Sequence, residues 1–383
     1  MSNWKELSGE KNWSGLLRPL KKSLGQTLIH YGKRIDAIYD TVEHSITSSS
    51  YGQPKYGEKE FFSKVGLGLY TMNNYVYGDS KIDFFAKGSR AWIGYVAVAT
   101  DEGKRQLGRR DIMVCWRGSV TIGEWIKDFQ FSQTSATPIL GEHSGNSRVH
   151  EGFFSIYMSA RDQVLNAVKK LVKQYQHEEI SITVTGHCLG GSFAILNAAD
   201  IVAKGYNNKS DCSCMPKAMV TVFAFASPQV GNSDFVKVFN NFSNLHLLHT
   251  RHFIDIVPEL PPTTNYSKMG TLLRITYTNF TIWDLIRPII LSVAEILTRF
   301  HHLKNLLVAI EKQQEKKGLL FAAAAPMVAV QGAPQLAGLP GANFAGDGTV
   351  ILDDEVNESN VVMEDLGNGN YKLYLRTPQR QTA

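Results

Sequence analysis

A cysteine between glycines marks the segment of the chain best suited to covalent chemistry. Cys188 lies in the sequence GHCLGG, after the apolar run ISITVT and before a stretch with helical spacing. A nucleophile on a strained strand-to-helix turn needs small residues two positions before and two positions after it, and Gly186 and Gly190 occupy those positions. The helix that follows directs the positive end of its dipole at developing negative charge. The pattern favours an accessible nucleophilic thiol; the alternative is a buried structural cysteine in a glycine turn.

The segments around this turn alternate between strand and helix patterns. Apolar residues recur with helical spacing over 154–176 and again after Cys188. Short apolar runs rich in β-branched residues predict strands, of which the first two are neighbours, at 92–100, 112–117, 180–185 and 219–228. Continuous apolar strands that alternate with helices are typical of a mostly parallel sheet covered on both faces. The sequence therefore predicts an α/β fold with a doubly wound sheet, and a further helix near 28–44 in a segment that wraps it.

The chain resembles the class 3 lipase family, and within it the plant class II phospholipase A1 acylhydrolases. The resemblance covers roughly residues 4–310 and rests on motifs that follow the family's order: CWRGSVTIGEWIKD, VHEGF, GHCLGG, FASPQVGN and RHFIDIVPELPP. It implies an α/β-hydrolase fold with a nucleophile elbow and an ester-hydrolysing activity that needs no cofactor. Residues 1–317 are then expected to form the lipase-like domain, with its N-terminal wrapping segment.

The resemblance also implies the residues of a catalytic site. Ser119 would contribute to the oxyanion hole, and the backbone amide of Leu189 would supply the second donor. Asp255 falls where the family keeps the acid of its triad. The stretch FHHL resembles the place of the family's histidine, which selects His301 as the base and leaves His302 as the alternative. The order nucleophile, acid, base is the one expected of an α/β-hydrolase.

The other histidines near these motifs are interpreted as structural. His187 is expected to pack beneath the elbow turn, and three more lie on or just after a strand, too near Asp255 in sequence to act as the base: His246, His249 and His252. No closely spaced group of His, Cys and carboxylate residues follows a metal-ligand pattern, so we expect no metal.

Cys188 is itself a departure, because the family has serine at this position. A thiol at a helix amino terminus beside an imidazole is expected to be largely a thiolate–imidazolium pair at neutral pH. Attack on an ester is then easy, but a thiolate leaves the tetrahedral intermediate more readily than an alkoxide does. We therefore expect slow hydrolysis of oxygen esters, whereas an acyl thioester, once formed, is suited to transfer onto an amine, a hydroxyl or another thiol.

Several hypotheses for the function stay open. The leading one is an acyl hydrolase or acyltransferase that acts on a hydrophobic, lipid-like ester or thioester through a covalent acyl-Cys188 intermediate. The alternatives are a cyclase or lyase that uses the oxyanion hole and His301 without covalent catalysis, a low-activity lipase-like binding protein, and a serine phospholipase A1 altered at its nucleophile. The joint presence of Ser119, Asp255 and His301 argues against a pure binder.

Charge and hydropathy limit the partners. The net charge is +5 and the basic residues are mixed with acids, which gives no case for nucleic-acid binding. Residues 282–300 are apolar but carry Asp284, Arg287 and Glu295. This pattern suits an amphipathic helix, packed on the core or lying at a lipid interface, better than a membrane span. The expected partner is a hydrophobic small molecule or lipid, and peripheral membrane contact stays open.

The two ends of the chain and its cysteines give the remaining expectations. The start, MSNWKELSGEKNW, resembles neither a secretory signal nor a transit peptide. The four cysteines do not make a disulfide framework, so we expect a reducing, cytoplasmic location: Cys115, Cys188, Cys212 and Cys214. Residues 318–383 are expected to be a linker rich in Ala, Gly and Pro, followed by a hairpin over 361–375 that turns at GNGN.

Overall fold

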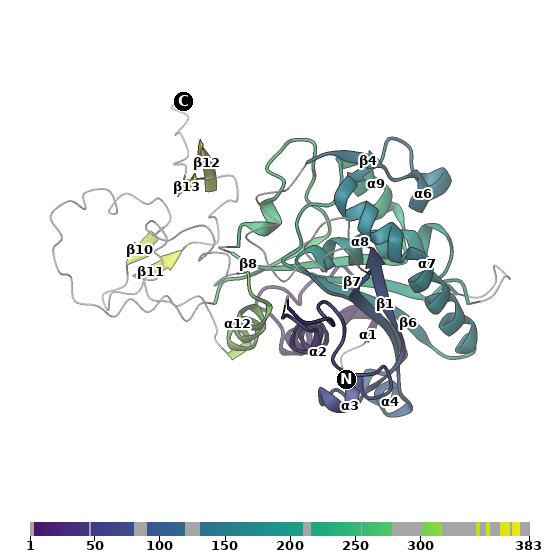
Figure 1. Ribbon diagram of the computed structural model, residues 1–383. Coiled ribbons are helices and arrows are strands. Elements are labelled where there is room, and N and C mark those ends of the chain that lie inside the picture. The colour runs from purple at the N-terminus through teal and green to yellow at the C-terminus, as the bar shows by residue number, and fades with distance from the viewer. Residues whose placement is uncertain are drawn as a thin grey trace.

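A single seven-stranded sheet organises the part of the chain that the structure describes. The structure is a computed structural model, and the residues described are 4–45, 47–79, 90–118, 131–209, 216–253, 255–277 and 301–315, with short strands at 342–344, 350–352, 361–367 and 370–375. The strand order of the main sheet is β1-β2-β3-β6-β7-β8-β9 (Figure 1). Its strands are β1 (Tyr70–Asp79), β2 (Arg90–Ala99), β3 (Arg110–Trp116), β6 (Ile180–His187), β7 (Met219–Phe225), β8 (Leu245–His252) and β9 (Thr271–Ile275).

The sheet is parallel from β3 to β9 and antiparallel from β1 to β3. The link between β2 and β3 holds only the short helix α4 (Asp101–Leu107), and so short a connection suits antiparallel neighbours better than a parallel crossover. In the parallel part, Trp116 pairs with Gly186 and His187 pairs with Phe225. The mostly parallel sheet is confirmed, and its register brings the carboxyl ends of β3, β6 and β7 together.

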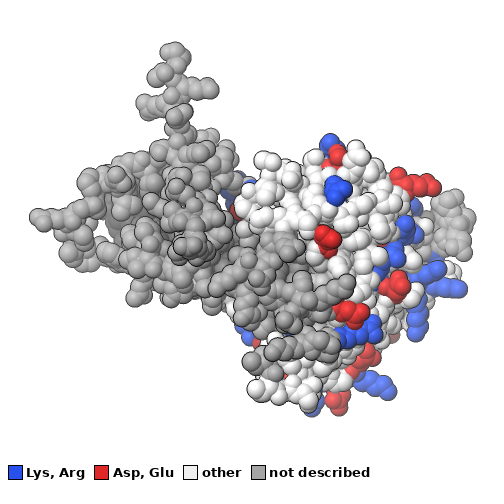
Figure 2. All heavy atoms as spheres, turned by 45° about the horizontal axis from the view of Figure 1, so that its top comes forward, with Lys and Arg blue, Asp and Glu red and all other residues white. Residues whose placement is uncertain are grey.

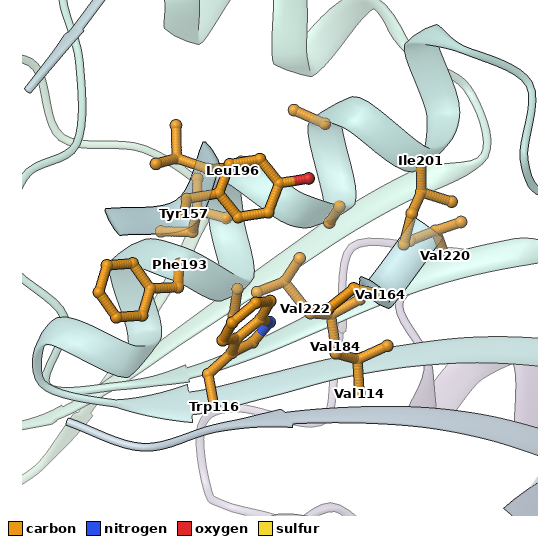
Figure 3. Close-up of a cluster of buried hydrophobic side chains, with 14 of the residues drawn as sticks. Val114, Trp116, Tyr157, Val164, Val184, Phe193, Leu196, Ile201, Val220 and Val222 are labelled. Carbon is orange, nitrogen blue, oxygen red and sulfur yellow. The ribbon is translucent and has the colours of Figure 1, made fainter. Parts of the chain in front are cut away.

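Helices cover both faces of this sheet. On one face lie α7 (Glu151–Gln174) and α8 (Leu189–Ala203), and on the other lie α2 (Lys22–Thr41) and α12 (Leu303–Glu315), which run side by side (Figure 1). Figure 3 shows the first interface, where strand residues such as Val114 and Val222 meet Tyr157 and Phe193 of the helices. Two separate apolar clusters fill the two faces. The arrangement is the doubly wound α/β fold that the pattern predicts.

A buried polar network, together with apolar packing, holds helix α2 against the sheet. The Asp111 carboxylate is fully buried and accepts four hydroxyl hydrogen bonds of 2.6–2.9 Å, from Tyr31, Tyr70, Ser181 and Thr183. Helix α2 begins six residues earlier than the predicted start at residue 28. The missed segment contains Gly25, where a Cβ would overlap the Gln314 side chain of α12. Glycine weakens helix propensity here but lets the two helices approach closely.

The remaining elements are short. They are α1 (Trp4–Leu7), α3 (Phe61–Lys64), β4 (Gln133–Ser135), α6 (Thr137–Leu140), η1 (Gly141–His143), β5 (Arg148–His150), α9 (Ser233–Asn241) and η2 (Val257–Glu259). In the tail, β10 (Ala342–Phe344) pairs with β11 (Val350–Leu352), and β12 (Val361–Gly367) pairs antiparallel with β13 (Asn370–Leu375), over the segment where the sequence predicts a hairpin.

The distribution of surface charges and the length of the helices can be compared with the expected partners. On the face shown in Figure 2, Lys and Arg residues lie among Asp and Glu residues without a continuous basic stripe. Among the described residues, no helix combines the length and the apolar character needed to cross a membrane. The predicted amphipathic helix at 282–300 lies outside the described residues, as do Cys212 and Cys214.

Candidate active site

The turn at Cys188 has the strained geometry that the glycine spacing predicts. Cys188 joins β6 to α8 with φ 56° and ψ −128°, a left-handed φ that side-chain-bearing residues rarely adopt. Its N–H donates to the Phe225 carbonyl oxygen at 2.9 Å. A Cβ on Gly190 would lie 2.5 Å from the Trp116 carbonyl oxygen, and a Cβ on Gly186 would overlap the Gly190 backbone. Both glycines are therefore required by close backbone contact at the turn.

The thiol itself is not accessible in this structure. Cys188 has 0% of its surface exposed, as has the other described free thiol, Cys115, so the expectation of an accessible thiol at Cys188 is wrong for this structure. The glycine pattern correctly fixes the local turn. Exposure depends on side chains from distant segments that pack over it, and spacing within one hexapeptide carries no information about them.

The structure places the predicted acid and base in direct contact. The His301 Nδ1 atom lies 2.8 Å from Asp255 Oδ2, and both residues are at least 97% buried, with exposed fractions of 1% and 3%. Asp255 follows the carboxyl end of β8, and its second oxygen accepts the Val257 N–H at 3.0 Å. His301 lies two residues before α12 begins. A carboxylate fixed in this way orients the ring, because Nδ1 must carry the hydrogen that Asp255 accepts.

The other ring nitrogen of His301 is directed into the site. Nε2 is buried and has no hydrogen-bond partner among the described residues. Burial lowers the pKa of His301, but the Asp255 carboxylate and the Cys188 thiol outweigh burial and raise this pKa to about 10. The titratable groups around the ring are Asp255, Cys188, His187 and the neighbouring His302. A buried imidazole between a carboxylate and a thiol can accept and return a proton at Nε2.

His302 has a different environment. It is exposed, and burial of part of its ring together with the charges on Lys304 and His301 lowers its pKa. Its carbonyl oxygen accepts the Leu306 N–H at 3.1 Å in the first turn of α12. Of the two adjacent histidines, the structure brings His301 to Asp255.

Comparisons with known proteins identify the family of this chain. The family described as Lipase (class 3) matches residues 113–265. Phospholipase A1-IIgamma of Arabidopsis thaliana is 42% identical over 300 residues, which cover 70% of this chain and 70% of the relative. Phospholipase A1-II 6 of Oryza sativa subsp. japonica is 42% identical over 302 residues, with 71% and 74% covered. The chain belongs to the class 3 lipase family.

A solved structure supports the fold of this class 3 lipase. The triacylglyceride lipase of Rhizomucor miehei aligns with 75% of this chain and 98% of its own length, at 21% identity and a TM-score of 0.50. A likeness at this identity concerns the fold alone. It agrees with the α/β-hydrolase architecture, with the elbow between β6 and α8.

Of the two predicted oxyanion-hole residues, the structure describes only Leu189. Leu189 is the first residue of α8 and is buried directly after the nucleophile position, so its amide lies at the amino terminus of that helix. Ser119 lies outside the described residues. Its neighbour Gly118 lies against the elbow, since a Cβ there would be 2.6 Å from the His187 carbonyl oxygen and 3.1 Å from the Cys188 Cβ. The end of β3 thus reaches the elbow of this lipase.

Two residues of the site have roles that sequence reasoning missed. His187, predicted to pack beneath the turn, contacts the Tyr39 hydroxyl at 3.0 Å through Nδ1 and the His301 carbonyl oxygen at 2.8 Å through Nε2. Tyr39 lies 148 residues away from it in sequence. The GHCLGG motif draws attention to His187, but no periodicity or spacing in α2 singles out Tyr39.

The three histidines of β8, His246, His249 and His252, lie in partly or fully buried environments. Burial lowers the pKa of each, to about 3 for His249 and about 4 for His252. His252 Nε2 lies 3.2 Å from the Tyr277 carbonyl oxygen. Within the described segments, no group of three or more His, Cys, Asp or Glu residues is arranged to hold a metal ion.

Proposed function

We propose that this class 3 lipase is an acyl hydrolase or acyltransferase that forms a covalent acyl-Cys188 intermediate from a hydrophobic, lipid-like ester or thioester. The observation that carries the proposal is the buried His301 ring, which Asp255 fixes through Nδ1 and whose Nε2 has no hydrogen-bond partner among the described residues. The Cys188 thiol is also one of the groups that raise the pKa of this ring. The phospholipase A1 names of the relatives support a lipid ester as substrate.

The first half of the reaction acylates the thiol. His301 Nε2 takes the Cys188 proton, and the sulfur attacks the carbonyl carbon of the substrate, whose C=O electrons move onto oxygen. The Leu189 amide and Ser119 would donate hydrogen bonds to that oxyanion. The carbonyl re-forms as the bond to the leaving group breaks, and His301 returns its proton to the departing oxygen or sulfur. The product is an acyl thioester on Cys188.

The second half removes the acyl group. Water, or an acceptor alcohol, amine or thiol, attacks the thioester carbonyl while His301 Nε2 takes its proton. The tetrahedral intermediate collapses with cleavage of the C–S bond, and the proton returns to the sulfur. The enzyme is then restored, and the acyl group is a free acid or is joined to the acceptor.

The sulfur nucleophile favours some substrates over others. With an oxygen ester, the Cys188 thiolate is a better leaving group than the alkoxide, so the first intermediate tends to revert to substrate. With a thioester or an activated aryl ester, the leaving group departs at least as readily as Cys188. We infer that such esters acylate the enzyme faster than ordinary lipid esters do.

Location and membrane contact are part of the proposal. A lipid-like substrate would be met at a lipid surface, so the proposal includes peripheral contact with such a surface. A cytoplasmic location stays a prediction. Vesicle sedimentation would test the contact, and fractionation of the expressing cell would test the location.

Intact-protein mass spectrometry tests the covalent step. After incubation with p-nitrophenyl butyrate, we expect one butyryl adduct that peptide mapping places on Cys188. The matched control is Cys188→Ala, which should carry no adduct, and Cys115 serves as an internal control because it is an equally buried free thiol. Turnover without an adduct would instead favour the non-covalent cyclase or lyase hypothesis.

A further inference from the structure

Two side chains outside the proposed triad form a hydrogen-bonded chain across the site. The Gly118 N–H donates to the Tyr39 hydroxyl oxygen at 3.0 Å. The same hydroxyl lies 3.0 Å from His187 Nδ1, and His187 Nε2 lies 2.8 Å from the His301 carbonyl oxygen. The chain therefore connects the end of β3, the elbow and the segment that leads into α12.

The partners fix the direction of every hydrogen bond in the chain. A carbonyl oxygen only accepts, so His187 Nε2 carries the hydrogen that goes to His301. In a neutral ring Nδ1 is then an acceptor, and the Tyr39 hydroxyl donates to it. The phenolic oxygen in turn accepts from Gly118. This tautomer follows from the partners, and it satisfies each polar atom without any charge.

The environment keeps His187 neutral. The residue is 4% exposed, and its pKa lies well below the ordinary value because burial and the neighbouring His301 disfavour a positive charge. The centroids of the two imidazole rings are 4.7 Å apart. Two imidazolium ions at this separation would repel each other, so a neutral His187 lets His301 be the one that holds the proton.

The residues of this hydrogen-bonded chain are closely packed. Gly118 lies between the Tyr39 hydroxyl and the elbow, and any Cβ there would overlap the hydroxyl. The His301 backbone is held through His187, while its ring is held by Asp255. A small shift of the His301 carbonyl would therefore move the ring relative to Cys188.

We propose that Tyr39 and His187 are positioning residues, which hold the His301 backbone and the end of β3 so that the imidazole stays between Asp255 and Cys188. This inference rests on the proposed function, because it assumes that Cys188 and His301 form the reacting pair. Neither side chain touches the substrate in this proposal. Their contribution is to keep the pair aligned.

A titration of the Cys188 thiolate tests the proposal without requiring a substrate. The ultraviolet absorbance of the thiolate is followed against pH, and the curve of Cys188→Ser is subtracted to isolate this thiol. Tyr39→Phe removes only the hydroxyl. We expect this substitution to move the thiolate midpoint upward by about half to one pH unit, because it removes one hydrogen bond that helps to align His301 with Cys188.

Tyr31→Phe is the matched control. Tyr31 lies on the same helix, is buried, and donates its hydroxyl hydrogen bond to Asp111 at 2.9 Å. The substitution should lower stability by an amount comparable to Tyr39→Phe and leave the thiolate midpoint unchanged. His187→Gln keeps an amide donor near the His301 carbonyl, so we expect a smaller shift from it than from His187→Leu.

The outcomes separate the two proposals. If Tyr39→Phe and His187→Leu titrate like wild type while His301→Ala does not, the pair exists and the positioning role is overturned. Equal upward shifts in Tyr39→Phe and Tyr31→Phe would mean that only general stability is at work, which also overturns it. Should wild type and His301→Ala titrate alike, the reacting pair is absent and both proposals fail.

Discussion

Helix α2 contributes to two buried polar networks, and they differ in completeness. At Asp111 a carboxylate receives four hydroxyl donors. Burial alone would raise the pKa of Asp111, but Arg109 and the hydroxyl donors lower it below the usual range. Eight residues after Tyr31 on α2, Tyr39 begins a neutral chain that ends at the His301 carbonyl oxygen. The ring Nε2 of the same histidine has no hydrogen-bond partner among the described residues. The Asp111 network holds the fold together, while the second network ends at a histidine whose pKa the Cys188 thiol helps to raise.

This difference suggests how structure and reactivity are divided in the molecule. A buried polar group normally has a partner, because leaving it unsatisfied costs about 1–3 kcal/mol. The Asp111 network follows that rule, because four hydroxyl groups donate hydrogen bonds to the ionised carboxylate and disfavour its protonation. At His301 the unsatisfied nitrogen marks the place where a proton or substrate group belongs.

The largest expected effect comes from removing the reactive end. His301→Ala should slow acylation of Cys188 by about a thousandfold or more, since loss of a base from a catalytic unit is among the most damaging changes. The rate of butyryl adduct formation at neutral pH measures it. His302→Ala is the control and should retain most of the rate; the reverse result would move the base by one residue.

The matching change in the Asp111 network should affect stability instead. Asp111→Asn leaves Arg109 without its buried counter-charge and places amide hydrogens against hydroxyl donors. We expect a loss of about 3 kcal/mol in the free energy of unfolding, the usual scale for a broken buried charge pair. Denaturant unfolding measures the loss. The thiolate midpoint of Cys188 should not move, and a shift there would show that the two networks are coupled through α2.

A smaller effect is expected from changing the nucleophile. Cys188→Ser should raise turnover of an ordinary alkyl ester by at least about tenfold, equivalent to a barrier lower by about 1.4 kcal/mol. The reason is that a serine alkoxide and the substrate alkoxide leave with comparable ease. Turnover of ethyl butyrate by the two proteins measures it, with the activated p-nitrophenyl ester as a control on which the difference should be smaller. A serine form that is no faster would contradict the leaving-group argument.

Sequence reasoning succeeded where local geometry or a motif decides the outcome. The glycines at 186 and 190 follow from backbone contact within one turn, and the strand runs follow from apolar continuity. The place of Asp255 came from the family motif. The choice of His301 over His302 depended on the register of one motif, and the structure brings His301, which lies before the first residue of α12, to within 2.8 Å of Asp255.

It failed where distant segments decide. The contact of Tyr39 with His187 joins residues 148 positions apart in sequence, and it depends on the packing of α2 against the sheet. The early start of α2 was missed because Gly25 is a weak helix former, although here its lack of a Cβ makes room for the Gln314 side chain of α12. These features are tertiary, and no window of the sequence contains them.

The smallest expected effect concerns a third polar contact of α2, at the surface beside α12. Lys304 Nζ lies 2.7 Å from Asp40 Oδ1 and 3.8 Å from Asp36 Oδ2. Burial raises the pKa of Asp36 to about 6; Lys304 opposes the rise, and the neighbouring Asp40 adds to it. A carboxyl whose pKa is raised by folding stabilises the native state fully below its unfolded pKa, near 4, and loses that contribution as pH rises through about 6.

Asp36→Asn should therefore stabilise the protein at pH 7, with a gain that disappears as pH falls from about 6 towards 4. The gain should be well below the loss from Asp111→Asn, because Asp36 keeps 17% of its side chain exposed and solvent screens its charge. Unfolding midpoints across this pH range measure it. Asp40→Asn is the matched control: it removes the exposed partner of Lys304 and should cost at most about 0.5 kcal/mol at neutral pH, opposite in sign. Equal signs for the two substitutions would show that the Lys304 contacts, rather than burial of Asp36, decide the charge balance where α12 joins α2.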